Sequence, residues 1–197
     1  MAHLNRCSWC GQHSDYVSYH DEEWGVPETN DHVLFELLTL EGAQAGLSWL
    51  TILRKREGYR KAFAKFDPSK VAGFSERDIV RLQADATIVR NKLKISSTVT
   101  NAAAFLNVME SHGTFANFIW DYVDGIPIQN EFGQLSDLPA QTALAEQISK
   151  DLKKLGFRFV GPTITYAFMQ AAGMVNDHVT SCFRRVEVAR LGEGRVV

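Results

Sequence analysis

The feature that most constrains the fold is a pair of apolar helical faces separated by a short turn between two glycines. The first face has apolar side chains at steps of four, four and three residues, the spacing of one side of an α-helix: Leu144, Ile148, Leu152 and Leu155. Gly156 ends this helix, and Gly161 followed by Pro162 is typical of the start of another. The second apolar face consists of Ile164, Phe168 and Ala172. The sequence therefore predicts two helices joined by a six-residue turn, over about residues 141–174.

The rest of the chain also shows helical rather than alternating periodicity, and proline and glycine are sparse. Asn30 is placed to cap a helix that continues towards Glu41, and Ser75 with Asp78 has the spacing of a capping box. We expect a long helix over about 87–109 and an irregular connection over 124–139, where glycine and proline recur. Because no domain boundary is evident, the sequence predicts an all-α fold in which residues 1–197 form a single unit.

Composition places the chain among ordinary globular proteins. Its 197 residues are 45% hydrophobic and 22% charged, with a formal net charge of −2. These values fit poorly with a disordered chain, a coiled coil or a protein that coats nucleic acid by bulk charge. No apolar run approaches the ~18 residues of a membrane span, and the N-terminus lacks the apolar stretch of a secretory signal. We expect a cytoplasmic monomer with no membrane partner and no obligate protein partner.

Charge is unevenly distributed along the chain. Residues 54–61 hold five basic side chains and one acidic, whereas residues 21–41 hold seven acidic side chains and no lysine or arginine. Lys150, Lys153, Lys154 and Arg158 cluster around the predicted turn. Gly156 and Gly161 would allow the backbone to approach a phosphate, and the next helix would direct free N–H groups at it. The segment fits a DNA-backbone site, although a solvated basic helical hairpin has the same pattern. If residues 54–61 share its face, the two basic segments would form one phosphate-binding stripe.

The three cysteines are too few for a disulfide framework, so metal binding is one alternative to burial in the core. His178 and Cys182 are four residues apart, on one face of a helix if that segment is helical. Cys7 and His20 lie near the other end of the chain. Two thiolates and two imidazoles complete a tetrahedral structural zinc site. Ordinary buried cysteines and a core histidine remain open, and so does a Cys7-x-x-Cys10 ligand pair.

Four motifs resemble the DNA-3-methyladenine glycosylase I family, in the same order as in that family: YHDEEWGVPETND, LEGAQAGLSW, DATIVRNKLKI and LKKLGFRFVGPTITYAFMQAAGMVNDHVTSC. The family belongs to the helix-hairpin-helix DNA glycosylase superfamily. The resemblance implies that fold, a double-stranded alkylated DNA substrate, and hydrolytic removal of 3-methyladenine. It also implies one structural Zn²⁺ held by Cys7, His20, His178 and Cys182, which would join the N- and C-terminal segments, and it leaves Cys10 without a role.

The same resemblance implies a pocket for a flipped base. Glu41 would contact the base, and the aromatic side chains around it would be Trp49, Tyr19, Trp9 and Trp24. Chemically the set is suitable, because aromatic faces and a carboxylate both attract the cationic base. Glu41 also stands out as a carboxylate in a largely apolar stretch. From the residues alone, a solvated Glu41 beside core aromatics is the competing interpretation.

The catalytic aspartate of broader superfamily members has no counterpart in the expected place. In those members an aspartate beyond the turn lies two residues before a histidine. The corresponding residue here is Asn176, two residues before His178, and Asp177 is one residue too late. Asp177 remains either an alternative base or a hydrogen-bond partner of a ligating histidine. Two other functions also remain open: a non-catalytic, zinc-stabilised binder of damaged DNA, and a small-molecule hydrolase that uses a zinc-bound water.

Overall fold

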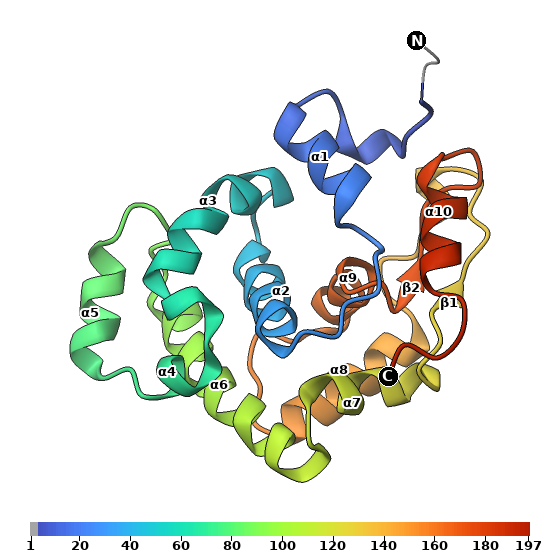
Figure 1. The fold of residues 1–197 in the computed structure, drawn as a ribbon. Coiled ribbons are helices and arrows are strands. Elements are labelled where there is room, and N and C mark those ends of the chain that lie inside the picture. Colours follow the sequence, from blue (N-terminus) through green and yellow to red (C-terminus); the bar gives the residue numbers. More distant parts are fainter. Residues whose placement is uncertain (1–3) are drawn as a thin grey trace.

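The computed structural model describes residues 4–197, and its fold is mostly helical (Figure 1). The α-helices are α1 Ser14–Glu22, α2 Asp31–Gln44, α3 Trp49–Ala62, α4 Pro68–Ala72, α5 Glu76–Ala84, α6 Lys92–His112, α7 Phe115–Trp120, α8 Ala143–Lys154, α9 Pro162–Ala171 and α10 Arg184–Leu191. Short 3₁₀ helices are η1 Ser8–Cys10, η2 Ala64–Phe66, η3 Asp121–Val123 and η4 Leu135–Asp137. Within this part of the chain no helix has both the length and the apolar character needed to cross a membrane.

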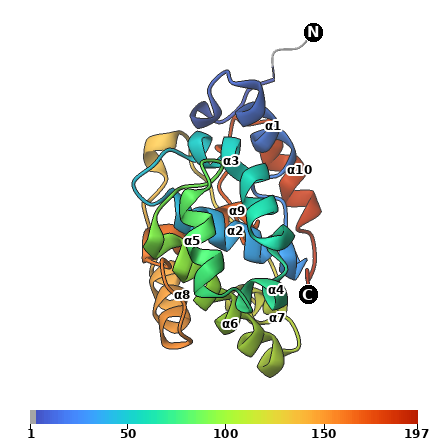
Figure 2. The same cartoon turned by 90° about the vertical axis from the view of Figure 1, so that its left-hand side faces the viewer.

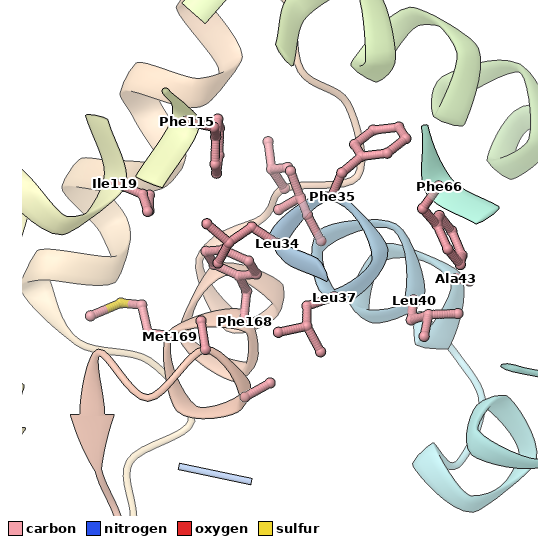
Figure 3. Close-up of a cluster of buried hydrophobic side chains, with 14 of the residues drawn as sticks. Leu34, Phe35, Leu37, Leu40, Ala43, Phe66, Phe115, Ile119, Phe168 and Met169 are labelled. Carbon is pink, nitrogen blue, oxygen red and sulfur yellow. The ribbon is translucent and has the colours of Figure 1, made fainter. Parts of the chain in front are cut away.

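Helix α2 lies at the centre of the fold, with α3 to α6 on one side and α9 and α10 on the other (Figures 1 and 2). Leu34, Phe35, Leu38 and Leu40 on α2 are each at most 1% exposed. Figure 3 shows side chains of α2 packed between Phe66 of η2, Phe115 and Ile119 of α7, and Phe168 and Met169 of α9. A helix that is apolar on nearly all sides needs such a central position, and Glu41 is carried into the interior with it.

Local capping signals set several helix boundaries where the sequence predicts them. The Asn30 side chain accepts hydrogen bonds from the N–H groups of His32 and Val33 and so begins α2. Ser75 and Asp78 form the expected capping box at α5. The long helix, however, begins at Lys92 rather than near Thr87, because Asp85 accepts two bonds from Thr87 and Asn91 provides the cap. Side-chain bonds to the backbone here stabilise a turn in place of the first helical turn.

The irregular connection over 124–139 contains the first of two very short strands. β1 Ile128–Gln129 pairs in parallel with β2 Val175–Asn176, which follows α9. The fold is thus mostly rather than entirely helical. Gly173 precedes β2 with a φ of +71°, and a Cβ there would lie 2.4 Å from the Val26 carbonyl carbon. The segment after α9 therefore packs directly against the connection from α1 to α2.

Helices α8 and α9 and the turn between them have the predicted positions. Gly156 adopts a φ of +96°, which a glycine tolerates without strain. The Asn101 side chain of α6 accepts from the Arg158 N–H at 2.8 Å and donates to its carbonyl at 2.9 Å. Phe159 contacts α2, since a Cβ on Gly42 would lie 3.3 Å from the Phe159 Cβ. The turn is thus fixed to both α6 and the end of α2 that carries Glu41.

Candidate active site and metal centre

A cavity of about 220 Å³ lies among η1, α1, α2, α3 and α9. The predicted pocket residues line it together: Glu41, Trp49, Tyr19, Trp9 and Trp24. Glu41 comes from the last turn of α2, and Trp49 is the first residue of α3, which Ser48 caps. The rings pack at angles rather than in a stack, with centroids 4.9 Å apart for Trp9 and Trp24 and 5.3 Å apart for Tyr19 and Trp49. The result is an aromatic chamber of the size of a small planar ligand.

Glu41 is 4% exposed, so the competing interpretation of a solvated helix residue is wrong. Within residues 4–197 the Glu41 carboxylate has no hydrogen-bond or ion-pair partner, and burial raises its pKa to about 8. The indole nitrogens of Trp9 and Trp49 are also buried without a partner in this part of the chain. Buried polar groups normally have partners, and the missing ones indicate a ligand that brings a cation or hydrogen-bonding groups.

A second cavity of about 230 Å³ adjoins the first and shares Glu41, Gln44 and Ala167 with it. Its other lining residues are Ala45, Gly46 and Leu47 of the loop after α2, and Thr163 and Ile164 at the start of α9. The α2–α3 loop is therefore next to the N-terminal end of α9. The Lys94 ammonium group fixes this loop, donating at 2.7 Å to the carbonyls of both Ala43 and Ala45.

Asp177 is 1% exposed and is held by three side chains. Its Oδ2 accepts from the Tyr166 hydroxyl at 2.6 Å and from the Gln170 amide at 2.7 Å, and its Oδ1 accepts from Asn130 at 2.7 Å. The hypothesis that Asp177 supports a ligating histidine is wrong, because the His178 Nε2 instead lies 3.0 Å from the Trp24 carbonyl. Asp177 is also not among the side chains that line the cavity.

Cys7, His20, His178 and Cys182 form a buried cluster whose ligand atoms all lie within 4.8 Å of one another. The Cys182 Sγ is 3.4 Å from the His20 Nε2 and 3.6 Å from the His178 Nδ1, and the Cys7 Sγ is 3.6 Å from the same nitrogen. In a tetrahedral zinc site, sulfur and nitrogen ligands lie about 3.6 Å apart. The cluster therefore has the donors and the spacing of a site that could hold zinc.

The surroundings of the cluster favour metal-ligand chemistry. The His20 Nδ1 is 2.7 Å from Asp21, and Arg6 in turn binds Asp21, so the Nε2 is directed towards the sulfurs. The Cys7 thiol, with His178 and His20, lowers the pKa of Cys182, which favours a thiolate. Cys10 lies outside the cluster, and its Sγ donates to the Cys7 carbonyl at 3.1 Å. The four residues with the spacing of metal ligands are thus Cys7, His20, His178 and Cys182, and they connect η1 and α1 to the segment before α10.

The turn between α8 and α9 exposes the basic side chains that the sequence singled out. Lys153, Lys154 and Arg158 are all exposed, and Lys154 pairs with Asp151 at 2.9 Å. A Cβ on Gly161 would meet nothing within 4 Å, so its backbone is accessible. Lys153 and Arg158 thus have no acidic partner among the described residues, whereas the charge of Lys154 is paired.

The basic segment 54–61 differs from the expected phosphate-binding surface. Arg56 is buried and bonded to Glu36 and Glu23, and Arg60 also bonds Glu36. Arg54 pairs with Asp15. These three charges are neutralised within the protein, so among the described residues only Lys55 and Lys61 of the five basic side chains lack an acidic partner, and the expected basic stripe is reduced to those two. Acidic residues distant in sequence fold against the segment, which local charge counting does not detect.

Fold and cavity together define a helical protein with an aromatic pocket, open to solvent on one side, that is suited to a planar, positively charged ligand. The family model for methyladenine glycosylase matches residues 9–185. The chain is 49% identical over 179 residues to DNA-3-methyladenine glycosylase 1 of Escherichia coli (strain K12), covering 91% of this chain and 96% of that protein. The chain therefore belongs to the methyladenine glycosylase family, and membership makes it a glycosylase.

Solved structures agree with this assignment. The 3-methyladenine DNA glycosylase I of Staphylococcus aureus, solved in a study of 3-methyladenine recognition, is similar with a TM-score of 0.90 at 39% identity. The match covers 93% of this chain and 98% of that one. A crystal structure of another 3-methyladenine DNA glycosylase I has a TM-score of 0.88 at 49% identity, over 91% of this chain and 98% of that one.

Sequence reasoning missed several residues that line the cavity: Tyr16, Gln44, Leu135, Leu138, Ala167 and Gln170. Tyr16 lies three residues before Tyr19 on α1, a spacing that places both rings on one helical face. Ala167 and Gln170 have the same spacing on α9. Helical spacing from a known pocket residue would have found Tyr16, but nothing in the sequence marks the face of α9 that turns towards α2.

Proposed function

We propose that the protein is a monofunctional DNA glycosylase that hydrolyses the N-glycosidic bond of 3-methyladenine in alkylated double-stranded DNA. The observation that carries the proposal is the buried Glu41 carboxylate, which has no partner within the described chain and faces a chamber of aromatic rings. The relatives named above bear the name of this activity. Glu41 is the catalytic residue of the proposal, in that it contacts the flipped base.

Recognition depends on the charge of the damaged base. The 3-methyladenine moiety in DNA is cationic, so it would offset the cost of an ionised Glu41 and attract the faces of Trp49, Tyr19, Trp9 and Trp24. Neutral adenine would leave the carboxylate buried beside an uncharged base, at a cost of several kcal/mol if the carboxylate stays ionised. The pocket thereby favours the alkylated base once it has left the duplex stack.

Chemistry follows from the same charge. The N-glycosidic bond breaks with its electron pair passing to the base, which leaves as a neutral molecule, while water adds to the sugar C1′ and gives a proton to solvent. Asn176 provides no base at the superfamily position, because its amide donates to Gln129 and to the Arg185 carbonyl. Because the alkylated base already carries the positive charge that protonation would otherwise supply, the bond is weakened from the start, and a pocket complementary to the departing base needs no protein acid for the leaving group. A lyase step that cleaves the strand is not part of the proposal.

The turn between α8 and α9 is proposed as the DNA-backbone site of a helix-hairpin-helix fold. Gly156 and Gly161 would allow close approach of a phosphate, and Arg158, Lys153 and Lys154 would contribute charge. The two hydrogen bonds between the Asn101 side chain and the Arg158 backbone, and the contact of Gly42 with Phe159, support this role because they fix the turn relative to Glu41. Phosphate binding would thus place the DNA in register with the pocket.

Cys7, His20, His178 and Cys182 are proposed to hold one structural Zn²⁺ per chain. When bound, the ion supplies stability and a fixed cross-link rather than a reactive water, since four side chains saturate the tetrahedral set. That saturation argues against the small-molecule hydrolase, which needs an open position. Residues 1–197 are proposed to act as one unit, as a cytoplasmic monomer with no obligate protein partner; residues 1–3 of it lie outside the described structure.

The proposal is tested by single-turnover release of 3-methyladenine from methylated duplex DNA. Glu41→Ala and Trp49→Ala should lower the release rate at least tenfold while circular dichroism and thermal unfolding show an intact fold. Glu110→Gln, which changes an exposed glutamate on α6, is the matched control and should retain the wild-type rate. DNA binding without base release by the wild-type protein would instead support a non-catalytic binder of damaged DNA.

A further inference from the structure

Asp177 is a buried carboxylate with no part in the proposed chemistry, yet it is tightly bonded. Its Oδ2 accepts from Tyr166 at 2.6 Å and from the Gln170 Nε2 at 2.7 Å. Burial and the bond to Asp177 raise the pKa of Tyr166, so the Tyr166 hydroxyl remains a donor. A carboxylate surrounded by donors accepts bonds only, and it therefore fixes which end of the Gln170 amide faces it.

Gln170 connects this network to the pocket. It lies on α9 three residues after Ala167, and both residues line the cavity that also contains Glu41. With its NH₂ group bound to Asp177, the amide presents its oxygen, Oε1, elsewhere. Within residues 4–197 no donor bonds to that oxygen. The wall of the pocket therefore includes an amide whose NH₂ end is occupied and whose oxygen is left without a donor among the described residues.

We propose that the Gln170 Oε1 is a second acceptor for the exocyclic amino group of the flipped base, and that Asp177 is the positioning residue that keeps this oxygen turned to the pocket. The inference rests on the proposed glycosylase function and adds a determinant of specificity to it. A 6-amino group offers two N–H donors, one for the Glu41 carboxylate and one for Gln170.

The arrangement selects between two alkylated purines of similar size. 3-Methyladenine carries the 6-amino group, whereas 3-methylguanine carries a 6-oxo group that only accepts. If the 6-oxo oxygen faces two acceptors, all three groups lack donors in a buried pocket. The cost of these unsatisfied groups lowers the kcat/KM for 3-methylguanine. Gln170 therefore acts on the ratio of the two excision rates more than on folding.

Gln170→Met tests the acceptor, because methionine has nearly the same length and lacks the amide. Excision of 3-methyladenine and 3-methylguanine is measured from one preparation of methylated duplex DNA, and kcat/KM is compared for each base. We expect about a tenfold loss for 3-methyladenine and little loss for 3-methylguanine, so that the preference falls about tenfold. Gln147→Met is the matched control, since the Gln147 amide also donates to an aspartate, Asp151, but on the exposed face of α8.

Asp177→Asn tests the positioning role. Without the fixed acceptor the Gln170 amide can turn either way, so the preference should fall towards that of Gln170→Met. The double variant should lose little more than either single one, because both substitutions remove the same oriented oxygen. A purely structural Asp177 would instead lower both excision rates alike and would add to Gln170→Met. Metal content and thermal unfolding of each variant show whether the neighbouring His178 site is intact.

Two results would overturn the inference. One is an unchanged preference in Gln170→Met while the wild-type protein excises 3-methyladenine. The other is full additivity of Asp177→Asn and Gln170→Met. Failure of the proposed function gives a different result, because the wild-type protein itself would then release no 3-methyladenine.

Discussion

Replacing Glu41 with glutamine should make the unliganded protein more stable, and increasingly so as the pH rises. Burial raises the pKa of Glu41 from its ordinary 4.5 to about 8. Between these values the folded protein retains a proton that the unfolded chain has released, so raising the pH favours unfolding. Below pH 4.5 both states are protonated and Glu41 contributes no pH dependence.

The size of the effect follows from the same two pKa values. Full ionisation of Glu41 in the folded state would cost about 5 kcal/mol, and about 3 kcal/mol of this already applies at pH 7. Because the cavity is open to water, we expect about half of these values. The difference in the free energy of unfolding between Glu41→Gln and wild type should thus grow by about 2 kcal/mol from pH 5 to pH 9.

Urea denaturation at pH 5, 7 and 9 measures this difference. All other ionisable groups are common to the two proteins, so their contributions cancel in the comparison. Glu110→Gln, at an exposed site, should show no such trend. A difference between Glu41→Gln and wild type that stays constant over this pH range would refute the argument that Glu41 is a buried carboxylate without a partner. The same substitution should lower 3-methyladenine release, which would show a group retained for function at the expense of stability.

Three further predictions concern other parts of the molecule. Cys182→Ser should lower bound zinc and the midpoint of thermal unfolding together, by removing one of four ligands, whereas Cys10→Ser should leave both unchanged; metal analysis and calorimetry measure them, and unaltered zinc in Cys182→Ser would reject the ligand set. Lys94→Met should destabilise the protein by ~1–3 kcal/mol and slow base release, because the carbonyls of Ala43 and Ala45 lose their donor. An unchanged free energy of unfolding in urea denaturation would show that these two hydrogen bonds do not stabilise the fold. Lys153→Ala should weaken binding to all duplexes and reduce the slope of log affinity against log salt by about 0.9, as one phosphate contact is lost; a slope equal to that of wild type, in titrations at several salt concentrations, would remove Lys153 from the interface.

Local signals were sufficient for much of the fold. The caps at Asn30 and Ser75 and the apolar spacing on α8 and α9 depend on residues within one or two helical turns, so they can be recognised in the sequence. The start of α6 could not be recognised in this way, because the Asp85 side chain accepts from the Thr87 N–H and the Asn91 side chain accepts from the Lys94 N–H, and these local bonds compete with the helix. Parallel pairing of β1 with β2 joins segments more than 40 residues apart, and two residues carry no strand pattern.

In the pocket, too, some residues could be recognised from the local sequence and others only from the packed structure. Glu41 was recognisable because a carboxylate is unusual in an apolar helix, and family resemblance supplied the aromatic residues around it. Gln170 was not recognisable, because a glutamine on a helix is ordinarily solvated. The orientation of its amide depends on Asp177 and on the approach of α9 to α2. Likewise the pairing of Arg56 and Arg60 with Glu36 depends on the packing of α2 against α3, which charge counting within segment 54–61 does not detect. Side-chain direction and long-range pairing are properties of the packed fold.

The most direct test of the central claim is chromatography of the bases released when the metal-replete wild-type protein is incubated with an excess of methylated duplex DNA. We predict free 3-methyladenine in molar excess over the protein, with unmodified adenine retained in the DNA and the strands uncut. Methylated DNA that keeps all its 3-methyladenine after this incubation would contradict the assignment of the Glu41 pocket to base excision.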